Sequence, residues 1–326
     1  MKEPMLVDSA CGSVCGPWRP LEPSNQESGC LAPTMAGRIG ASIELMRPKN
    51  LVLAAATVPL GAYFALMEGD GPFPWLAVTL HLLAVTCFTG AGNAMNDIKD
   101  AEIDRTAHPS RPIPSGRLSL EQAKTFAGVL WALSVAAHVG GLLSFDAGLS
   151  VVLPTAGIYL LAVVLMLTYD HGPSTKNKGL AGNIVISLLV GAVILYGAAG
   201  VGGIGASLVW WIFGVVFLTN LAREMVKDCM DMEADEGSRQ TLPMVYGKER
   251  VRMAAYVLLM GALVCLYMPF WRGPFAFGQL VLQLPAILLL ITLNGPLYKG
   301  DDALVARRIR LAMLAGLVSF IVATQV

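Results

Sequence analysis

Residues 93–116 read NAMNDIKDAEIDRTAHPSRPIPSG and lie at the end of a long apolar segment. At about 100° per residue, the polar side chains of this stretch fall within a sector of about 100° on one helix face. These side chains are Asn93, Asn96, Asp97, Asp100 and Asp104. Three carboxylates on one stripe repel one another unless hard cations lie between them, and oxygen ligands with room left for phosphate oxygens are typical of Mg2+ sites. The stretch therefore predicts a magnesium site that binds a diphosphate.

The composition predicts an all-α membrane protein. Of the 326 residues, 55% are hydrophobic and 14% are charged, and the mean hydropathy is +0.61, which is unlike a soluble globular domain. Apolar windows long enough to cross a bilayer recur nine times. They cover approximately residues 48–67, 75–96, 120–143, 149–169, 180–199, 207–229, 251–271, 276–294 and 304–324. We therefore expect a polytopic bundle of about nine transmembrane helices in a lipid bilayer.

The lysine and arginine side chains indicate how these helices are oriented. In the nine-helix arrangement the cations gather at one face, and only Arg272 falls at the other. By the positive-inside rule, we expect a multi-pass protein of the cell membrane whose N-terminus and acidic stretches are cytoplasmic and whose C-terminus is external. The formal net charge is zero, so total charge identifies no partner. Nothing in the sequence implies a nucleic acid or a protein partner.

Residues 1–36 differ in composition from the rest of the chain. They are rich in Pro, Ser and Gly and lack a long apolar core, which argues against a signal peptide and predicts a disordered cytoplasmic tail. Cys11, Cys15 and Cys30 form no CxxC pair and have no nearby His, which argues against a metal site in the tail. Residues 37–326 form the predicted transmembrane domain.

A stiff loop follows the first acidic stretch. The prolines that prevent a helix there are Pro109, Pro112 and Pro114, and Gly116 permits a turn. Because arginine suits bidentate contact with phosphate oxygens, the loop could hold Arg111 and Arg105 over a diphosphate. Cations in a cytoplasmic loop are also expected from topology alone, so both interpretations stay open for these residues and for Lys178, which lies in a later cationic loop.

A second acidic stretch, residues 220–236, ends a later apolar segment and repeats the first. One constant offset in residue number, the repeat offset, aligns Asp97, Asp100 and Asp104 with Asp228, Asp231 and Asp235. It also aligns Pro112, Gly116 and Arg117 with Pro243, Gly247 and Lys248. Four predicted helices separate the two copies, and four crossings restore the chain direction. The pattern therefore predicts a parallel four-helix pseudo-repeat with both carboxylate sets at one membrane face.

These motifs resemble those of the UbiA family of intramembrane prenyltransferases. The family's hallmark is an NDxxDxxxD motif after the second helix and another Asp-rich motif after the sixth. Here the first motif is NDIKDAEID at residues 96–104, followed by RPIPSG at residues 111–116. The second motif contains REMVKD at residues 223–228, and together with KGLAGN at residues 178–183 it is most similar to the archaeal ether-lipid branch of the family. The resemblance covers residues 42–326.

The resemblance implies transfer of a geranylgeranyl group from geranylgeranyl diphosphate to the hydroxyl of geranylgeranylglyceryl phosphate, which forms the second ether bond of an archaeal membrane lipid. It implies Mg2+ as cofactor. The carboxylates expected to bind the metal and to serve in catalysis are Asp97, Asp100, Asp104, Asp228, Asp231 and Asp235. The residues expected to bind substrate are Asn93, Asn96, Arg111, Lys178, Asn183, Arg223 and Lys227.

Two other functions fit parts of the pattern. The same chemistry could act on an aromatic or chlorin acceptor, which product analysis with competing acceptors distinguishes. A secondary transporter also combines repeats with intramembrane carboxylates. Transport sites usually lie near the midplane of the membrane, however, whereas both acidic sets lie at the ends of predicted helices.

Overall fold

The computed structural model describes residues 34–326 except residues 68, 70, 145–147, 171–174, 234, 236 and 238. Residues 1–33 of the predicted tail therefore lie outside the described residues. The long helices are α2 (Pro48–Leu66), α3 (Trp75–Lys99), α5 (Leu120–Ser144), α6 (Leu149–Asp170), α7 (Leu180–Ala199), α8 (Ser207–Asp231), α10 (Lys248–Trp271) and α13 (Asp302–Ala323). The shorter elements are α1 (Met35–Leu45), α4 (Ala101–Ala107), η1 (Thr175–Asn177), α9 (Leu242–Tyr246), η2 (Phe277–Gln283), α11 (Leu284–Ile291) and α12 (Asn294–Lys299), of which η1 and η2 are 3-10 helices.

Each predicted apolar window coincides with a long helix, or with η2 and α11 in the case of residues 276–294. Within the described residues, seven segments are long and apolar enough to cross a membrane. Helix α2 adds only the shorter apolar segment Ala54–Leu66, and α13 is not among the seven. The prediction of an all-α membrane bundle is confirmed, whereas the count of nine crossings stays a prediction.

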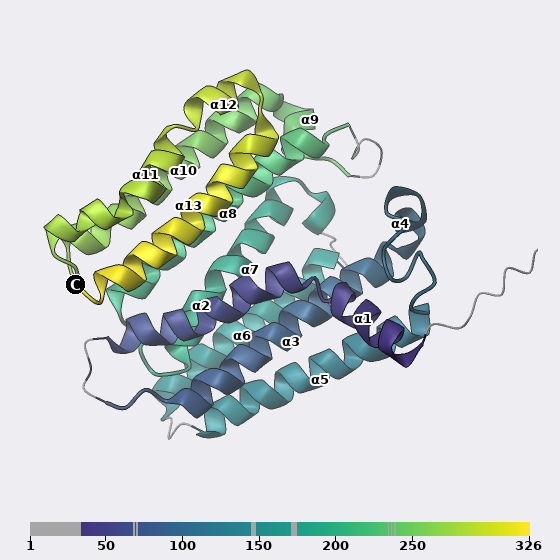
Figure 1. Ribbon diagram of the computed structural model, residues 1–326, viewed down its shortest axis with the longest axis horizontal. Coiled ribbons are helices and arrows are strands. Elements are labelled where there is room, and N and C mark those ends of the chain that lie inside the picture. The colour runs from purple at the N-terminus through teal and green to yellow at the C-terminus, as the bar shows by residue number, and fades with distance from the viewer. Residues whose placement is uncertain are drawn as a thin grey trace, which may run out of the picture.

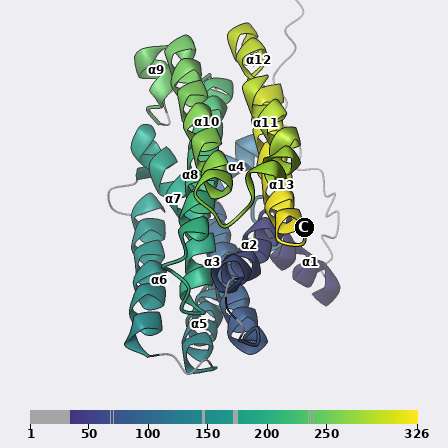
Figure 2. The same ribbon diagram turned by 90° about the vertical axis from the view of Figure 1, so that its left-hand side faces the viewer.

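Helix α7 begins the second half of the chain and lies next to α2 of the first half, as Figure 1 shows. In the first half α3 packs against α5, and in the second half α8 packs against α10 and α13. Helix α7 contacts both α2 and α8. The view in Figure 2 shows the long helices running in roughly the same direction through the bundle.

The contact between α2 and α7 depends on two glycines. A Cβ atom at Gly61 would lie 2.2 Å from the carbonyl oxygen of Ile194, and a Cβ atom at Gly197 would lie 2.2 Å from that of Val58. Neither position therefore accepts a side chain without movement of the backbone. Small residues at such contacts let membrane helices approach closely, and here they join the first long helix of each half.

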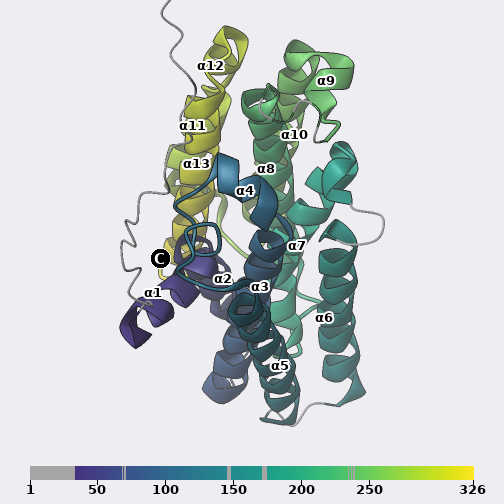
Figure 3. The same cartoon turned by 90° about the vertical axis from the view of Figure 1, so that its right-hand side faces the viewer.

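The two acidic motifs have the same local backbone geometry. The amide of Asp104 donates a hydrogen bond to the carbonyl oxygen of Asp100 at 2.8 Å, and the amide of Asp235 donates to that of Asp231 at 2.9 Å. Helix α4, which carries the end of the first motif, and helix α9, which follows the second, both lie in the upper half of Figure 3. The two motifs thus lie toward one end of the bundle.

The expectation that residues 93–104 share one helix is wrong. Helix α3 ends at Lys99, and Asp100, with φ −85° and ψ 5°, separates it from α4. The break comes where the chain leaves its apolar segment, and Asp104 consequently lies on a separate short helix. There its carboxylate contacts Arg111 of the proline-rich loop.

Candidate active site

The first acidic motif contains two buried carboxylates, each paired with an arginine. Asp97 on α3 is 5% exposed and Asp104 on α4 is 4% exposed. Arg47 Nη2 lies 2.5 Å from Asp97 Oδ1. Arg111 Nη1 lies 2.5 Å from Asp104 Oδ2 and 3.7 Å from Asp97 Oδ1. Because a buried carboxylate is stable only with a compensating partner, this end of α3 requires positive charge.

Arg47 reaches Asp97 from an unusual backbone conformation between α1 and α2. Among the described residues, it is the only one other than glycine with a positive φ, which is 56°. Asn93 Nδ2 donates a 2.8 Å hydrogen bond to the carbonyl oxygen of Met46 and so ties this junction to α3. A left-handed arginine is strained, and such strain concentrates at functional sites. The candidate role of this strained backbone is to hold the guanidinium of Arg47 against the carboxylate of Asp97.

The next carboxylate of the first motif is held by an amide. Asn96 Nδ2 donates to Asp100 Oδ2 at 3.2 Å. Asn93 and Asn96, both predicted to bind substrate, thus have partners within the protein in this structure. Their contacts hold the α1–α2 junction and the carboxylate of Asp100.

In the second motif, an amide from α7 holds the buried carboxylate. Asp228 on α8 is 7% exposed and Asn183 on α7 is 8% exposed. Asn183 Nδ2 donates to Asp228 Oδ2 at 2.8 Å. The structure therefore brings together two predicted site residues that are 45 positions apart. Asp228 occupies the position in the second half that Asp97 occupies in the first.

Two predicted phosphate ligands of the second motif share one carboxylate. Arg223 Nη1 lies 2.5 Å from Glu224 Oε1, and Lys227 Nζ lies 3.0 Å from Glu224 Oε2. Glu224 is itself only 16% exposed at its side chain. Both cations are therefore directed to Glu224 rather than to Asp228.

Arg239 pairs with the last carboxylate of the second motif. Its Nη2 lies 2.5 Å from Asp235 Oδ2. Burial alone would lower the pKa of the Arg239 guanidinium, but the hydrogen bond and charge of Asp235 outweigh burial and raise it, so Arg239 stays charged. The buried Nε atoms of Arg223 and Arg239 have no hydrogen-bond partner among the described residues, and neither does the hydroxyl of Thr241. Such donors suit the oxygens of a phosphate.

The loops that precede α7 and follow α8 meet at a backbone bridge between Lys178 and Gln240. The repeat offset that relates the two motifs also pairs Arg47 with Lys178. These two cations precede α2 and α7, the helices joined by the glycine contact.

Arg105, another cation considered for diphosphate binding, faces Glu102 at 3.4 Å, and both of these side chains are largely exposed.

The donor atoms of the motifs fit a hard divalent cation. Within the described residues, no three His, Cys, Asp or Glu side chains converge closely enough to form a metal-binding group. The first motif instead presents carboxylates whose charge is compensated by arginines. Carboxylate oxygens without nearby His or Cys ligands favour Mg2+ over softer metals. The residues present therefore fit Mg2+, provided that the side chains rearrange on binding.

A helical membrane bundle with matching Asp-rich motifs at one end has the architecture of an intramembrane prenyltransferase. The sequence profile of the UbiA prenyltransferase family matches residues 54–317, and the chain belongs to that family. The digeranylgeranylglyceryl phosphate synthase of Methanopyrus kandleri is 34% identical over 284 residues, which cover 86% of this chain and 98% of the relative. That of Natronomonas pharaonis is 31% identical over 287 residues, which cover 87% and 97%.

Solved structures show the same fold. A digeranylgeranylglyceryl phosphate synthase structure has a TM-score of 0.71 and 27% identity, and the match covers 88% of this chain and 98% of the other. A UbiA homolog from Archaeoglobus fulgidus bound to GPP and Mg2+ has a TM-score of 0.60 at 16% identity, with 88% of this chain and 100% of the other covered. The second likeness concerns the fold alone.

Sequence reasoning did not assign Arg47 or Glu224 to the site. Arg47 reads as an anchor at headgroup level, because cations before a membrane helix are expected there. The signal that could have found it is the repeat offset, which pairs it with the candidate ligand Lys178. No sequence signal distinguishes Glu224 from its acidic neighbours.

Proposed function

We propose that this chain transfers a geranylgeranyl group from geranylgeranyl diphosphate to the free hydroxyl of geranylgeranylglyceryl phosphate, forming the second ether bond of an archaeal membrane lipid. The observation that carries the proposal is the pair of buried aspartates, Asp97 and Asp228, at matching positions of two halves. The curated relatives that match this chain over almost their whole length are digeranylgeranylglyceryl phosphate synthases, which supports the choice of substrates.

In this proposal the two acidic motifs would together hold Mg2+. The ligands are Asp97, Asp100 and Asp104 of the first motif and Asp228, Asp231 and Asp235 of the second. When bound, Mg2+ supplies positive charge that stabilises the diphosphate as a leaving group. The relatives solved with GPP or DMAPP and Mg2+ support the use of a divalent cation.

The cations around the motifs bind the diphosphate oxygens. Arg111 lies next to Asp97 and Asp104, and Arg223 and Lys227 lie on the same helix as Asp228. Lys178 approaches from the loop that bridges to Gln240. Each charge-assisted contact is worth about 1.5 to 3 kcal/mol. Asn93, Asn96 and Asn183 orient the α1–α2 junction and two of the carboxylates through the hydrogen bonds described above.

The reaction breaks one C–O bond and forms another. The bond between C1 of the geranylgeranyl group and the diphosphate breaks, and its electron pair leaves with the diphosphate. The acceptor hydroxyl oxygen then bonds to C1 and loses its proton to a carboxylate or to the released diphosphate. Apolar helix surfaces exclude bulk water, which would otherwise capture the allylic cation as an alcohol.

The acceptor's phosphate provides the test. The site presents more cations than one diphosphate requires, and a phosphorylated acceptor uses the surplus. We expect kcat/KM for geranylgeranylglycerol to be lower than for geranylgeranylglyceryl phosphate by about one to two orders of magnitude for each charge-assisted bond that the missing phosphate would have made. Equal rates at matched membrane concentration would contradict phosphate recognition, and preferential alkylation of a competing aromatic acceptor would favour the aromatic alternative.

A charge variant sharpens this comparison. Lys178→Gln should reduce kcat/KM for the phosphorylated acceptor more than for geranylgeranylglycerol if Lys178 contacts the acceptor, and equally for both if it contacts only the diphosphate. Lys124→Gln is the matched control, because Lys124 is an exposed cation paired with Glu121 outside both motifs. We also place both motifs at the cytoplasmic face, because the cationic loops surround them.

A further inference from the structure

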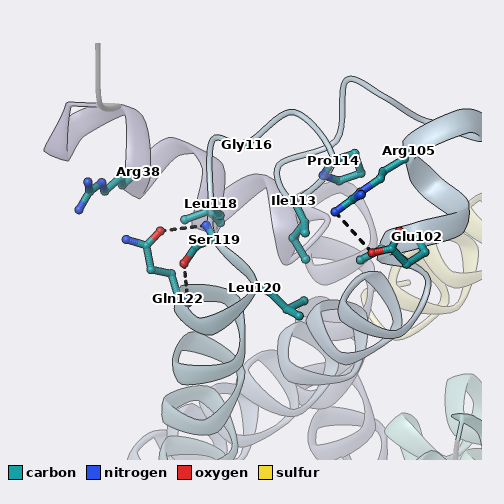
Figure 4. A pocket seen from close by; sticks show the side chains of 11 residues that line it. Arg38, Glu102, Arg105, Ile113, Pro114, Gly116, Leu118, Ser119, Leu120 and Gln122 are labelled. Carbon is teal, nitrogen blue, oxygen red and sulfur yellow. Dashed lines mark hydrogen bonds and ion pairs between the residues drawn. The ribbon is translucent and has the colours of Figure 1, made fainter. Parts of the chain in front are cut away.

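A recess lies between the proline-rich loop, α4 and the start of α5. It has a volume of about 560 Å³ and is formed by α1, α4, the loop and the start of α5. Figure 4 shows Arg38 at one side, Arg105 and Glu102 at the other, and Gln122 between Arg38 and the loop. Ile113 and Pro114 line the recess, whereas Arg111 of the same loop is bonded to Asp104. None of the six candidate metal ligands lines the recess, although Ala101 and Glu102 of the first motif do.

An apolar groove adjoins this recess. It has a volume of about 520 Å³ and runs between α1 and α5, and Arg38 lines both hollows. Its apolar lining consists of Met35, Ile39 and Ile43 of α1, of Met46 just after this helix, and of Phe126 and Leu130 of α5. A polar recess that continues into an apolar groove has the form of a site for an amphiphile.

The surface of α1 indicates where this amphiphile comes from. Met35, Ile39 and Ile43 recur every four residues and are 82%, 55% and 52% exposed, while Ala41 and Leu45 on the other face are buried. An amphipathic helix with this pattern lies in the membrane interface. The groove is continuous with α5, a membrane-crossing helix whose exposed side chains face lipid.

The charges of the recess favour an anion. Within the described residues no ion pair engages the guanidinium of Arg38. Arg105 and Glu102 neutralise each other's charge at 3.4 Å. The net positive charge of the recess therefore comes from Arg38. Ser119 and Gln122 cap the start of α5 through the Gln122 Oε1 atom and the Ser119 hydroxyl, so the Nε2 donor of Gln122 stays available. In Figure 4 this end of Gln122 points to the side on which Arg38 lies.

We propose that the recess and groove bind one anionic phospholipid of the surrounding leaflet. Its phosphate contacts Arg38 and the amide of Gln122, and one of its chains lies in the apolar groove along Ile39 and Ile43. The lipid packs behind Ile113 and Pro114 and so supports the loop that carries Arg111. This inference does not depend on which reaction the enzyme performs.

The test is lipid binding to the full chain in detergent, measured by native mass spectrometry with phosphatidylglycerol and with phosphatidylcholine. Arg38→Gln should weaken phosphatidylglycerol binding about fivefold, the contribution of one basic side chain near an anionic membrane surface, and should leave phosphatidylcholine binding unchanged. Ile39→Ser should weaken both lipids. Both positions are exposed, so the fold is expected to persist, which the thermal midpoint verifies.

Lys124→Gln is the matched control, because Lys124 is an exposed cation of α5 that lines neither hollow. It should bind both lipids as the parent chain does. Unchanged phosphatidylglycerol binding in Arg38→Gln would overturn the proposal, as would an equal loss in Lys124→Gln. Displacement of phosphatidylglycerol by inorganic phosphate at equal concentration would also overturn it, because the site would then recognise a free anion rather than a lipid.

Discussion

Arg47 and a divalent cation compete for Asp97 if the metal binds the Oδ1 atom of that carboxylate. Arg47 Nη2 lies 2.5 Å from Asp97 Oδ1, so a metal that binds this oxygen must displace the guanidinium. Replacing Arg47 with glutamine removes the competing charge and keeps a polar side chain of similar reach. We therefore expect Arg47→Gln to bind Mg2+ more tightly than the parent chain in the absence of diphosphate.

The size of the effect follows from the exposure of the pair. Removing one partner of a fully buried ion pair costs about 3 to 5 kcal/mol, and an exposed pair contributes about 0 to 1 kcal/mol. The Arg47 side chain is 35% exposed and Asp97 is 6% exposed, and Arg111 remains 3.7 Å from the same oxygen. An intermediate value of about 1 to 2 kcal/mol corresponds to about fivefold to thirtyfold tighter Mg2+ binding.

Mg2+ titrations of the thermal midpoint measure this affinity, because a ligand that binds only the folded state stabilises it by RT ln(1 + L/Kd), where L is the ligand concentration, and so raises the midpoint. Turnover of Arg47→Gln at saturating Mg2+ should fall, since the diphosphate loses a nearby cation. Lys124→Gln is the control, because Lys124 is an exposed cation paired with Glu121 at 2.8 Å outside both motifs. Weaker or unchanged Mg2+ binding in Arg47→Gln would refute the competition.

Three further outcomes test the site and the fold. Excess EDTA should abolish turnover and Mg2+ should restore it, and full activity in EDTA would rule out the metal mechanism. Asp100→Asn and Asp231→Asn should each lower turnover more than tenfold, a barrier increase above about 1.4 kcal/mol; retention of more than a tenth would show that the residue is not an important metal ligand. Gly61→Ala should lower the thermal midpoint, because its Cβ would lie 2.2 Å from the carbonyl oxygen of Ile194, whereas Gly128→Ala, with nothing within 4 Å, should not.

Hydropathy and the internal repeat predict most of the fold. The nine windows coincide with helical segments because apolar runs bounded by turn residues determine where a chain crosses a bilayer. The repeat offset also extends to backbone conformation: Gly116 and Gly247 have φ values of 74° and 83°, which favour glycine. The break between α3 and α4 at Asp100 was not predictable, because the periodic pattern of polar residues continues through it. The position of α4 becomes clear only from the contact between Asp104 and Arg111.

The pairing of charges within the site could not be read from the sequence. Arg223 and Lys227 lie on the same helix as both Glu224 and Asp228, so spacing alone allows either carboxylate to be their partner. The structure selects Glu224 and gives Asp228 an amide from α7. The partner of Asp228 depends on how α7 packs against α8, which is a tertiary contact that residue spacing does not predict.

The two motifs differ in how they hold their matching aspartates, and this difference bears on the order of metal binding. Asp97 is held by arginines on two sides, whereas the hydrogen-bond partner of Asp228 is the neutral amide of Asn183. A cation that binds Asp228 disturbs no ion pair of that carboxylate, while one that binds the Oδ1 atom of Asp97 must displace Arg47. The second motif should therefore bind one Mg2+ without diphosphate. Binding of another Mg2+ at the first motif should need diphosphate, because the diphosphate oxygens can replace Asp97 as the partner of Arg47. Arg47→Gln removes that requirement, so its two Mg2+ affinities should lie closer together than those of the parent chain.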